Sequence, residues 1–258
     1  MLLVIDVGNS HTVLGLYDGE TLRDHWRIFT SSHRTADELG LLFLSLLRAA
    51  DISPSQIEAC CIGSVVPPLD TALEEACREA FGTPPLFVGP GIRTGLVIQV
   101  ENPKEVGADR IANAVAALEH YGGPAIVIDF GTATTFDVVT GRSEYRGGVI
   151  VPGIQISADA LFEKCAKLPR VQITRPPQVI GRDTLSNIRS GLTYGYADLV
   201  EGLIGRIAAE MGADPTTASD GPPKVIVTGG FASLIAELTR KIDHVDPFLT
   251  LKGLRAIY

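Results

Sequence analysis

The sequence reads Val4-Ile5-Asp6-Val7-Gly8-Asn9-Ser10 near its start and Val127-Ile128-Asp129-Phe130-Gly131-Thr132-Ala133 in its middle. In both stretches an apolar run typical of a buried strand leads into Asp-x-Gly and a small polar residue. Two further β-rich runs, joined by short turns, follow each stretch and predict three strands in succession. The same local pattern used twice indicates an internal duplication.

Helical and strand patterns alternate after each copy. After the first we expect a strand at Ile57 to Ile62 and helices over Ala36 to Ala50, Leu69 to Phe81 and Val106 to Tyr121. After the second we expect a strand at Lys224 to Val227 and helices over Ser157 to Lys167, Leu185 to Met211 and Ala232 to Lys241. The order βββαβα, used twice, predicts an α/β protein of two similar domains, 1–122 and 123–258, divided at Gly122-Gly123-Pro124. The pattern does not place the last stretch, Pro247 to Tyr258, which either stays in the second domain or returns to the first.

The composition is that of a globular protein with a sizeable core: 258 residues, 45% hydrophobic and 20% charged. Its uncharged runs are too short to span a membrane, and its start has no signal-peptide pattern. We therefore expect a cytoplasmic protein without a membrane partner. A net charge of -8 argues against nucleic acid as a partner, because nonspecific affinity for it comes from Lys and Arg.

The cysteines lack the spacing of a metal site. There are 4 of them, with no Cys-x-x-Cys among Cys60, Cys61, Cys77 and Cys165. Cys60 and Cys61 are adjacent within an apolar stretch, so we interpret these two as buried packing residues and all four as structural thiols.

Asp6 and Asp129 each end an apolar strand and are followed at the second position by glycine, which lets the backbone turn closely around a ligand. Such a hairpin directs N–H groups at phosphate oxygens, while the carboxylate can hold metal-bound water, as we expect for Mg²⁺ at Asp6. One such turn is usually structural. Two in matched contexts favour phosphate binding, and the alternative is a duplication that kept its turns for folding alone.

A buried strand running into Gly229-Gly230 and then a helix lets a flat ring, such as adenine, lie against the backbone. A tight strand-to-helix connection is the alternative. No Gly-x-x-x-x-Gly-Lys-Ser/Thr pattern occurs, which excludes the usual phosphate-loop folds.

Another stretch that carries chemistry, Gly107-Ala108-Asp109-Arg110, begins a helix after a Pro-containing loop. Its residues alone also fit helix capping and surface charge.

These features resemble the superfamily of acetate and sugar kinases, heat-shock ATPases and actin, and within it type III pantothenate kinase is specifically matched. The matching stretches run in order along essentially the whole chain: Asp6 to Ser10, Asn102 to Asn113, Asp129 to Thr135, Gly147 to Gly153 and Gly181 to Thr184. The resemblance implies two ribonuclease-H-like domains of the actin-like ATPase superfamily. It also implies ATP-dependent phosphorylation of pantothenate to 4′-phosphopantothenate, the first step of coenzyme A biosynthesis.

The resemblance further implies roles for single residues. Asp109 is expected to be the general base that accepts the proton of the pantothenate hydroxyl. The expected ATP-binding residues are Asp6, Val7, Gly8, Asn9, Ser10, His11, Thr12 and Val13, with Thr132, Gly229 and Gly230 from the second domain. The expected substrate-binding residues are Val100, Gly107, Ala108, Asp109, Arg110 and Thr184.

The implied cofactors are Mg²⁺ with ATP and a monovalent cation, potassium or ammonium, at Asp129. The implied assembly is a homodimer, with Thr184 near its interface. One departure is plain: many members carry Tyr two residues before the Asn-Pro, where this chain has Val100, so a hydroxyl contact to the substrate is missing.

Two other functions stay open at this point. A kinase for another alcohol or carboxylate would keep Asp6, Asp129 and the two glycines, and a non-catalytic accessory regulator would share the fold. Having both Asp6 and Asp109 favours the enzyme.

Overall fold

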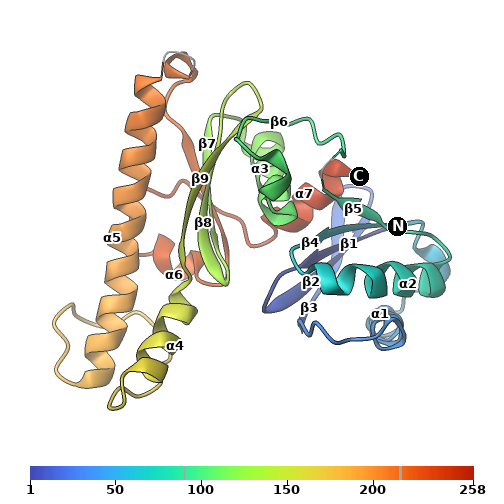
Figure 1. Cartoon of the computed structure of the whole chain (residues 1–258), viewed down its shortest axis with the longest axis horizontal. Coiled ribbons are helices and arrows are strands. Elements are labelled where there is room, and N and C mark those ends of the chain that lie inside the picture. Colours follow the sequence, from blue (N-terminus) through green and yellow to red (C-terminus); the bar gives the residue numbers. More distant parts are fainter. Residues whose placement is uncertain (90, 215–216) are drawn as a thin grey trace. The chain divides into compact units, whose positions relative to one another are not determined.

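The computed structural model describes residues 1–89, 91–214 and 217–258, which form two compact units (Figure 1). Unit 1 comprises Met1–Gly95, Glu101–Ala116 and Leu249–Tyr258, and unit 2 comprises Leu96–Val100 and Ala117–Phe248. The boundary between the two compact units therefore falls inside helix α3 (Ala108–Tyr121). The expected boundary of the duplicated domains, at residue 122, stays a prediction.

Unit 1 is built on a five-stranded sheet in the order β3-β2-β1-β4-β5. Strands β1 (Leu2–Val7), β2 (His11–Asp18) and β3 (Thr21–Phe29) are antiparallel neighbours, whereas β4 (Ala59–Ser64) and β5 (Leu86–Val88) continue the sheet parallel to β1. Because side chains alternate along a strand, β1 sends Leu3, Ile5 and Val7 into one core and Val4 and Asp6 to the opposite face.

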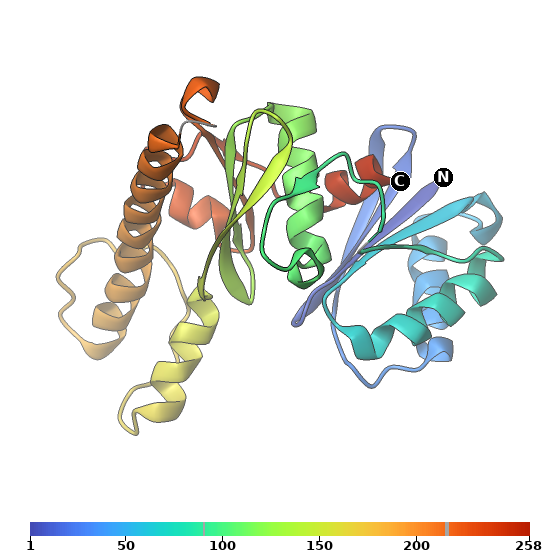
Figure 2. The same ribbon diagram turned by 45° about the horizontal axis from the view of Figure 1, so that its top comes forward.

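The two faces of this sheet are covered by different helices. The core beneath Leu3 and Ile5 is closed by α1 (Ala36–Ala49) and α2 (Asp70–Phe81), which lie side by side (Figure 2). Helix α1 begins at a capping box in which Thr35 and Glu38 exchange hydrogen bonds. The C-terminal helix α7 (Leu249–Ile257) packs against β1, β2 and β4, and Gly253 lets it approach the backbone of Ala112 in α3.

Unit 2 is built on a six-stranded sheet in the order β11-β10-β7-β8-β9-β6. Strands β7 (Ala125–Phe130), β8 (Ala133–Val139) and β9 (Glu144–Pro152) are antiparallel neighbours, and β10 (Lys224–Gly229) runs parallel to β7. The short strands β11 (His244–Val245) and β6 (Val97–Ile98) complete the two edges.

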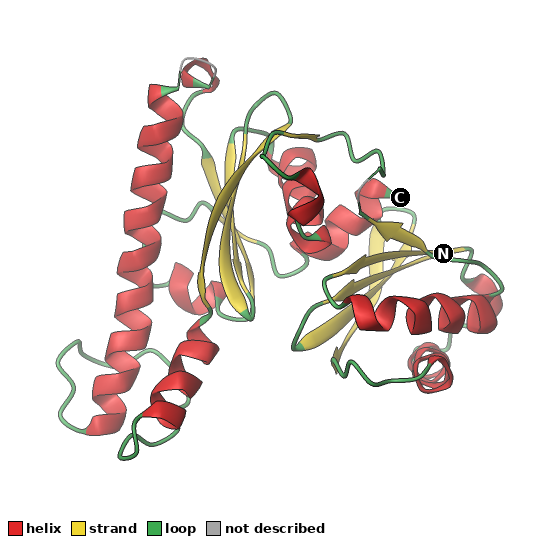
Figure 3. Ribbon diagram, viewed as in Figure 1, coloured by secondary structure: helices red, strands yellow, loops and turns green. Residues whose placement is uncertain are grey.

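The core of unit 2 forms between this sheet and α4 (Ile154–Lys164), α5 (Thr184–Ala213) and α6 (Ala232–Ala236). Figure 3 shows α5 as the long helix of the unit. No helix in the described part of the chain is both long enough and apolar enough to cross a membrane.

Two helix expectations need correction. The helix expected over residues 232 to 241 ends at Ala236, because the chain turns back to add β11, and the Asp243 carboxylate accepts a hydrogen bond from the Val225 N–H. Helix α4 starts at Ile154, before the expected Ser157, because the Gly153 carbonyl already accepts a hydrogen bond from the Ser157 N–H.

The expected burial of Cys60 and Cys61 is confirmed. Cys60, Cys61 and Cys77 are buried free thiols, whereas Cys165, just after α4, is exposed. Burial raises the pKa of Cys61 to about 12, and a hydrogen bond with Cys77 together with burial raises that of Cys60. The Cys60 and Cys61 thiols are therefore protonated packing groups.

Candidate active site

The turn after β1 is held from both sides. The Gly8 N–H donates to the His11 carbonyl at 3.0 Å, which closes the turn, and the Thr30 N–H at the end of β3 donates to the Ser10 carbonyl at 3.1 Å. The Thr12 and Thr30 hydroxyls are also hydrogen-bonded, at 2.9 Å. The stretch from Asp6 to Val13 is therefore a rigid hairpin in unit 1, with the His11 side chain exposed.

Asp6 lies in the middle of the sheet, between Val13 of β2 and Gly63 of β4. Paired residues on neighbouring strands point to the same face. A Cβ at Gly63 would lie 3.6 Å from the Cβ of Ala108, the first residue of α3. The side chain of Asp6 therefore points to the face of the sheet on which α3 begins.

The start of α3 carries Asp109 in its first turn. The Ile111 N–H donates to the Gly107 carbonyl at 3.1 Å, so Gly107 is the N-cap and Asp109 the second helical residue. Asp109 Oδ1 accepts the Arg110 N–H at 2.8 Å. Burial raises the pKa of Asp109, and the Arg110 N–H and guanidinium oppose that shift. A carboxylate with a raised pKa at a helix start suits the acceptance of a proton.

In unit 2, Asp129 is the penultimate residue of β7 and pairs with Thr228 of β10 and Thr135 of β8. A Cβ at Gly229, where φ is +90°, would lie 2.6 Å from Asp129 Oδ1. The Gly230 N–H donates to the Phe130 carbonyl at 3.1 Å. The carboxyl ends of the parallel strands β7 and β10 thus bring Asp129, Gly229 and Gly230 together, which is where open α/β sheets bind ligands.

Thr132, in the turn after Asp129, is tied to the start of α4. Its carbonyl accepts the Gly153 N–H at 3.2 Å, and a Cβ at Gly153 would clash with the carbonyls of Gly131 and Thr132. Gly153, the last residue of the matching stretch from Gly147, therefore holds the Thr132 turn against α4. The sequence signal for this role is a glycine between a strand and a helix.

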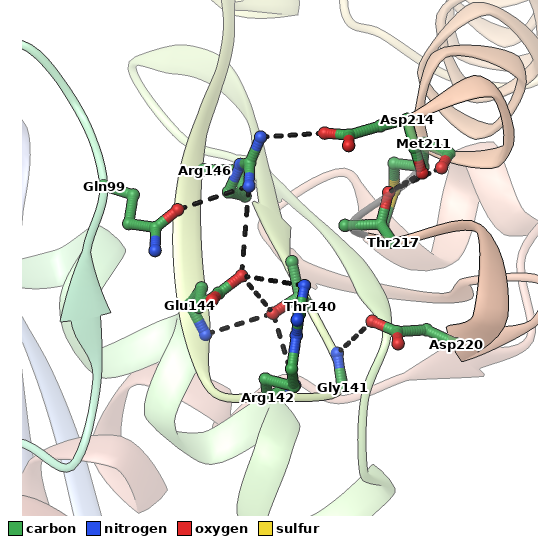
Figure 4. Close-up of polar contacts among 10 residues, drawn as sticks. All are labelled: Gln99, Thr140, Gly141, Arg142, Glu144, Arg146, Met211, Asp214, Thr217 and Asp220. Carbon is green, nitrogen blue, oxygen red and sulfur yellow. Dashed lines mark hydrogen bonds and ion pairs between the residues drawn. The ribbon is translucent and has the colours of Figure 1, made fainter.

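Val100 belongs to the segment that forms the edge of unit 2. The Gln99 N–H donates to the Tyr145 carbonyl at 2.8 Å, and Val100 Cγ1 lies 3.6 Å from where a Cβ at Gly147 would be. Arg146 braces this segment, because its guanidinium donates to Gln99 Oε1 at 3.2 Å and pairs with Asp214 at 2.9 Å (Figure 4). No local pattern could have found this brace, since its members are far apart in sequence.

Thr184 is the exposed first residue of α5. The preceding Asp183 is the N-cap, and its carboxylate accepts the Ser186 N–H at 2.8 Å. That hydrogen bond lowers the pKa of Asp183.

Each unit gathers part of the predicted site. Unit 1 brings the Asp6 to Val13 hairpin and the start of α3 to one face and one end of its sheet. Unit 2 brings Asp129, Thr132, Gly229 and Gly230 to the carboxyl ends of β7 and β10. Val100 and Thr184 also belong to unit 2.

Comparison with solved structures shows the fold. A Baf family transcriptional activator from Campylobacter jejuni superimposes with a TM-score of 0.60 at 18% identity, covering 99% of this chain and 96% of that chain. The activator of 2-hydroxyisocaproyl-CoA dehydratase from Clostridium difficile, with bound ADPNP, gives a TM-score of 0.57 at 10% identity over 99% and 94%. The expected fold of the actin-like ATPase superfamily is confirmed.

Sequence comparison shows the family. The family model described as type III pantothenate kinase matches residues 2–206. Proteins named type III pantothenate kinase from Anaeromyxobacter sp. (strain K) and Myxococcus xanthus (strain DK1622) are 52% and 51% identical over 258 residues, covering 100% of this chain and 98% of each relative. One from Geobacillus kaustophilus (strain HTA426) is 51% identical and covered to 97%. The chain belongs to the type III pantothenate kinase family.

Proposed function

We infer that this protein transfers a phosphoryl group from ATP to pantothenate and forms 4′-phosphopantothenate and ADP, the first step of coenzyme A biosynthesis. Family membership over the whole chain supports this reaction. The observation that carries the mechanism is a carboxylate, Asp109, whose pKa is raised by burial and which lies in the first turn of a helix on the Asp6 face of the sheet. Phosphoryl transfer depends mainly on positioning and charge neutralisation.

The hairpin from Asp6 to Val13 is the proposed phosphate site of unit 1. Its hydrogen bonds to His11 and Thr30 fix the turn before a ligand arrives, so binding orders little additional backbone. The Asp6 carboxylate and the Ser10 hydroxyl are oxygen donors, which fit Mg²⁺ bound through water. When bound, Mg²⁺ neutralises charge on the phosphates.

Asp109 is the proposed general base, and it takes the proton of the pantothenate hydroxyl as the phosphoryl group arrives. Arg110, the next residue, is proposed to bind the pantothenate carboxylate, because a guanidinium fork matches a carboxylate in a bidentate pair. The remaining residues proposed to contact the substrate are Gly107, Ala108, Val100 and Thr184.

In unit 2, Asp129 is the proposed ligand of a monovalent cation, potassium or ammonium. The residues present fit such an ion, since the Asp129 carboxylate lies beside the backbone of Gly131 and Gly229 and offers hard oxygen donors. Thr132 is proposed to contact ATP, and Gly229 and Gly230 its adenine ring.

A homodimer is the proposed assembly. Unit 2 exposes large apolar side chains that a second copy would cover: Ile150, Ile156, Phe162, Val179 and Ile180. Light scattering after gel filtration measures this state directly. The cytoplasm is the proposed location, because the reaction consumes ATP.

A coupled assay of ADP release tests the function. We expect release with pantothenate and not with a panel of other hydroxy acids and sugars, and more in potassium than in sodium. Turnover of a different acceptor would identify another kinase, and no ADP release with any acceptor would indicate the accessory regulator. Full activity without potassium or ammonium would remove the cation role from Asp129.

A further inference from the structure

Gly107, the N-cap of α3, has one close neighbour where a side chain would be. A Cβ at this position would clash with Asp109 Oδ1, and the next nearest side-chain atom, Val65 Cγ1, lies at an ordinary 3.4 Å. No backbone atom is among these neighbours. The space that glycine leaves open is therefore occupied by the Asp109 carboxylate.

Backbone geometry does not require glycine at Gly107. Its φ lies outside the left-handed region, unlike that of Gly229. Helix N-caps usually carry Ser, Thr, Asp or Asn, whose side-chain oxygen accepts the N–H of the second or third helical residue. The third helical residue here is Arg110, and Asp109 Oδ1 accepts its N–H at 2.8 Å. The carboxylate of Asp109 has taken the hydrogen bond that an N-cap side chain would make.

We propose that Gly107 is a positioning residue, whose missing side chain reserves the capping position of α3 for the Asp109 carboxylate. This proposal rests on the proposed role of Asp109 as the base. With Oδ1 held by the Arg110 N–H, the carboxylate has one orientation, and Oδ2 is the oxygen assigned to the proton of the substrate hydroxyl. Gly107 thus acts on the reaction through Asp109.

Unit 2 contains a related arrangement that cannot be tested as cleanly. A Cβ at Gly229 would lie 2.6 Å from Asp129 Oδ1, but also 2.7 Å from backbone atoms of Phe130. Substitution there strains the backbone as well as moving a carboxylate. At Gly107 the one crowded atom among the described residues belongs to a side chain that can rotate.

Two substitutions separate positioning from folding. Gly107→Ala places a methyl group where Oδ1 lies, and we expect kcat to fall by about 10- to 100-fold, as for a misplaced catalytic group, with an unchanged KM for ATP. Gly107→Ser supplies a capping hydroxyl that competes for the Arg110 N–H, so we expect an unchanged or higher Tm together with reduced kcat. Gly40→Ala, in open space on α1, is the matched control and should keep full activity.

Each substitution is then repeated in an Asp109→Ala background. If Gly107 acts through Asp109, Gly107→Ala has no further effect on kcat there, because residues acting as a unit are non-additive. An equal fold-loss in both backgrounds would mean that Gly107 serves the substrate directly, and the proposal would be overturned.

A readout without substrate keeps this test apart from the proposed function. ¹³C NMR titration of the Asp109 carboxyl should give different pKa values in wild type and Gly107→Ala, because the carboxylate leaves both its buried position and the Arg110 N–H. An unchanged titration overturns the positioning role. Failure of the base assignment would be seen separately, as activity retained in Asp109→Asn.

Discussion

Shortening Leu254 of α7 to alanine tests whether the C-terminal helix is an integral part of unit 1. Leu254 is 0% exposed, and its Cδ2 lies 3.0 Å from where a Cβ at Gly63 would be, beside Asp6 in the sheet. Removing a buried leucine side chain costs the transfer free energy of the lost atoms plus that of the cavity, about 2 to 5 kcal/mol. That is a large part of the roughly 5 to 15 kcal/mol by which typical domains are stable.

The reverse change at the same contact is Gly63→Ala. Its methyl group would press on Leu254 and reach 3.6 Å from the Cβ of Ala108, so overpacking should cost about 1 to 3 kcal/mol. In the double variant the new methyl group fills part of the space vacated by Leu254. We therefore expect the double variant to be more stable than the sum of the single losses predicts, by about 1 kcal/mol.

Urea unfolding followed by fluorescence measures these effects. The chain has 1 tryptophan, Trp26 on β3, which packs against the core of unit 1 and reports on that unit. Leu41→Ala, on α1 and 67% exposed, is the matched control and should change the stability by less than about 0.5 kcal/mol. A loss at Leu254 no larger than the control's, or strictly additive losses in the double variant, would refute the packing of α7 on β4.

Three further predictions concern the site. Asp109→Asn should lower kcat by about 10²- to 10⁴-fold. Because burial raises the pKa of Asp109, the ionised carboxylate destabilises the fold at neutral pH. The Asp109→Asn variant should therefore have a higher Tm than wild type at pH 7. That gain in Tm should vanish as the pH falls below the usual aspartate pKa, where the carboxyl is protonated in both the folded and the unfolded state. A Tm below that of wild type at pH 7 would contradict the destabilising burial of the ionised carboxylate. Gly229→Ala should raise the potassium concentration needed for activity and for thermal stabilisation, because its Cβ would displace Asp129. Its Cβ also strains the backbone beside Phe130, so the readout is the dependence on potassium and not the Tm or kcat by itself. Gly230→Ala, in open space, should leave that potassium requirement unchanged; equal potassium effects would count against the assignment. Val100→Tyr should lower KM for pantothenate by about two- to tenfold without moving KM for ATP, which is the effect of one added neutral hydrogen bond; a raised KM would show that the pocket has repacked.

Local sequence patterns were sufficient for the repeated part of the fold. The strands that carry Asp6 and Asp129 are each followed by two antiparallel strands, as the alternation of apolar residues predicts. The bounds of α1 and α2 also match their apolar spacing closely. These features depend on neighbouring residues alone, which is why the chain order reveals them. The residues proposed to bear the chemistry were singled out partly by the same local patterns, with Asp6 and Asp129 near strand ends and Asp109 near a helix start. Their roles stay predictions.

Contacts between distant segments were settled only by the tertiary structure. The apolar face of the nine-residue helix α7 fits any apolar partner by its pattern, and the space left by Gly63 and Gly253 is what lets the helix pack in unit 1. Likewise, Leu96–Val100 becomes an edge of unit 2 through its pairing with β9. The role proposed for Gly107 depends on the position of Asp109 Oδ1, which only the tertiary structure gives. The periodicity of a segment predicts which of its faces is apolar. The partner against which that face packs is determined by complementary shape and by the hydrogen bonding of buried polar groups, and both depend on residues far along the chain.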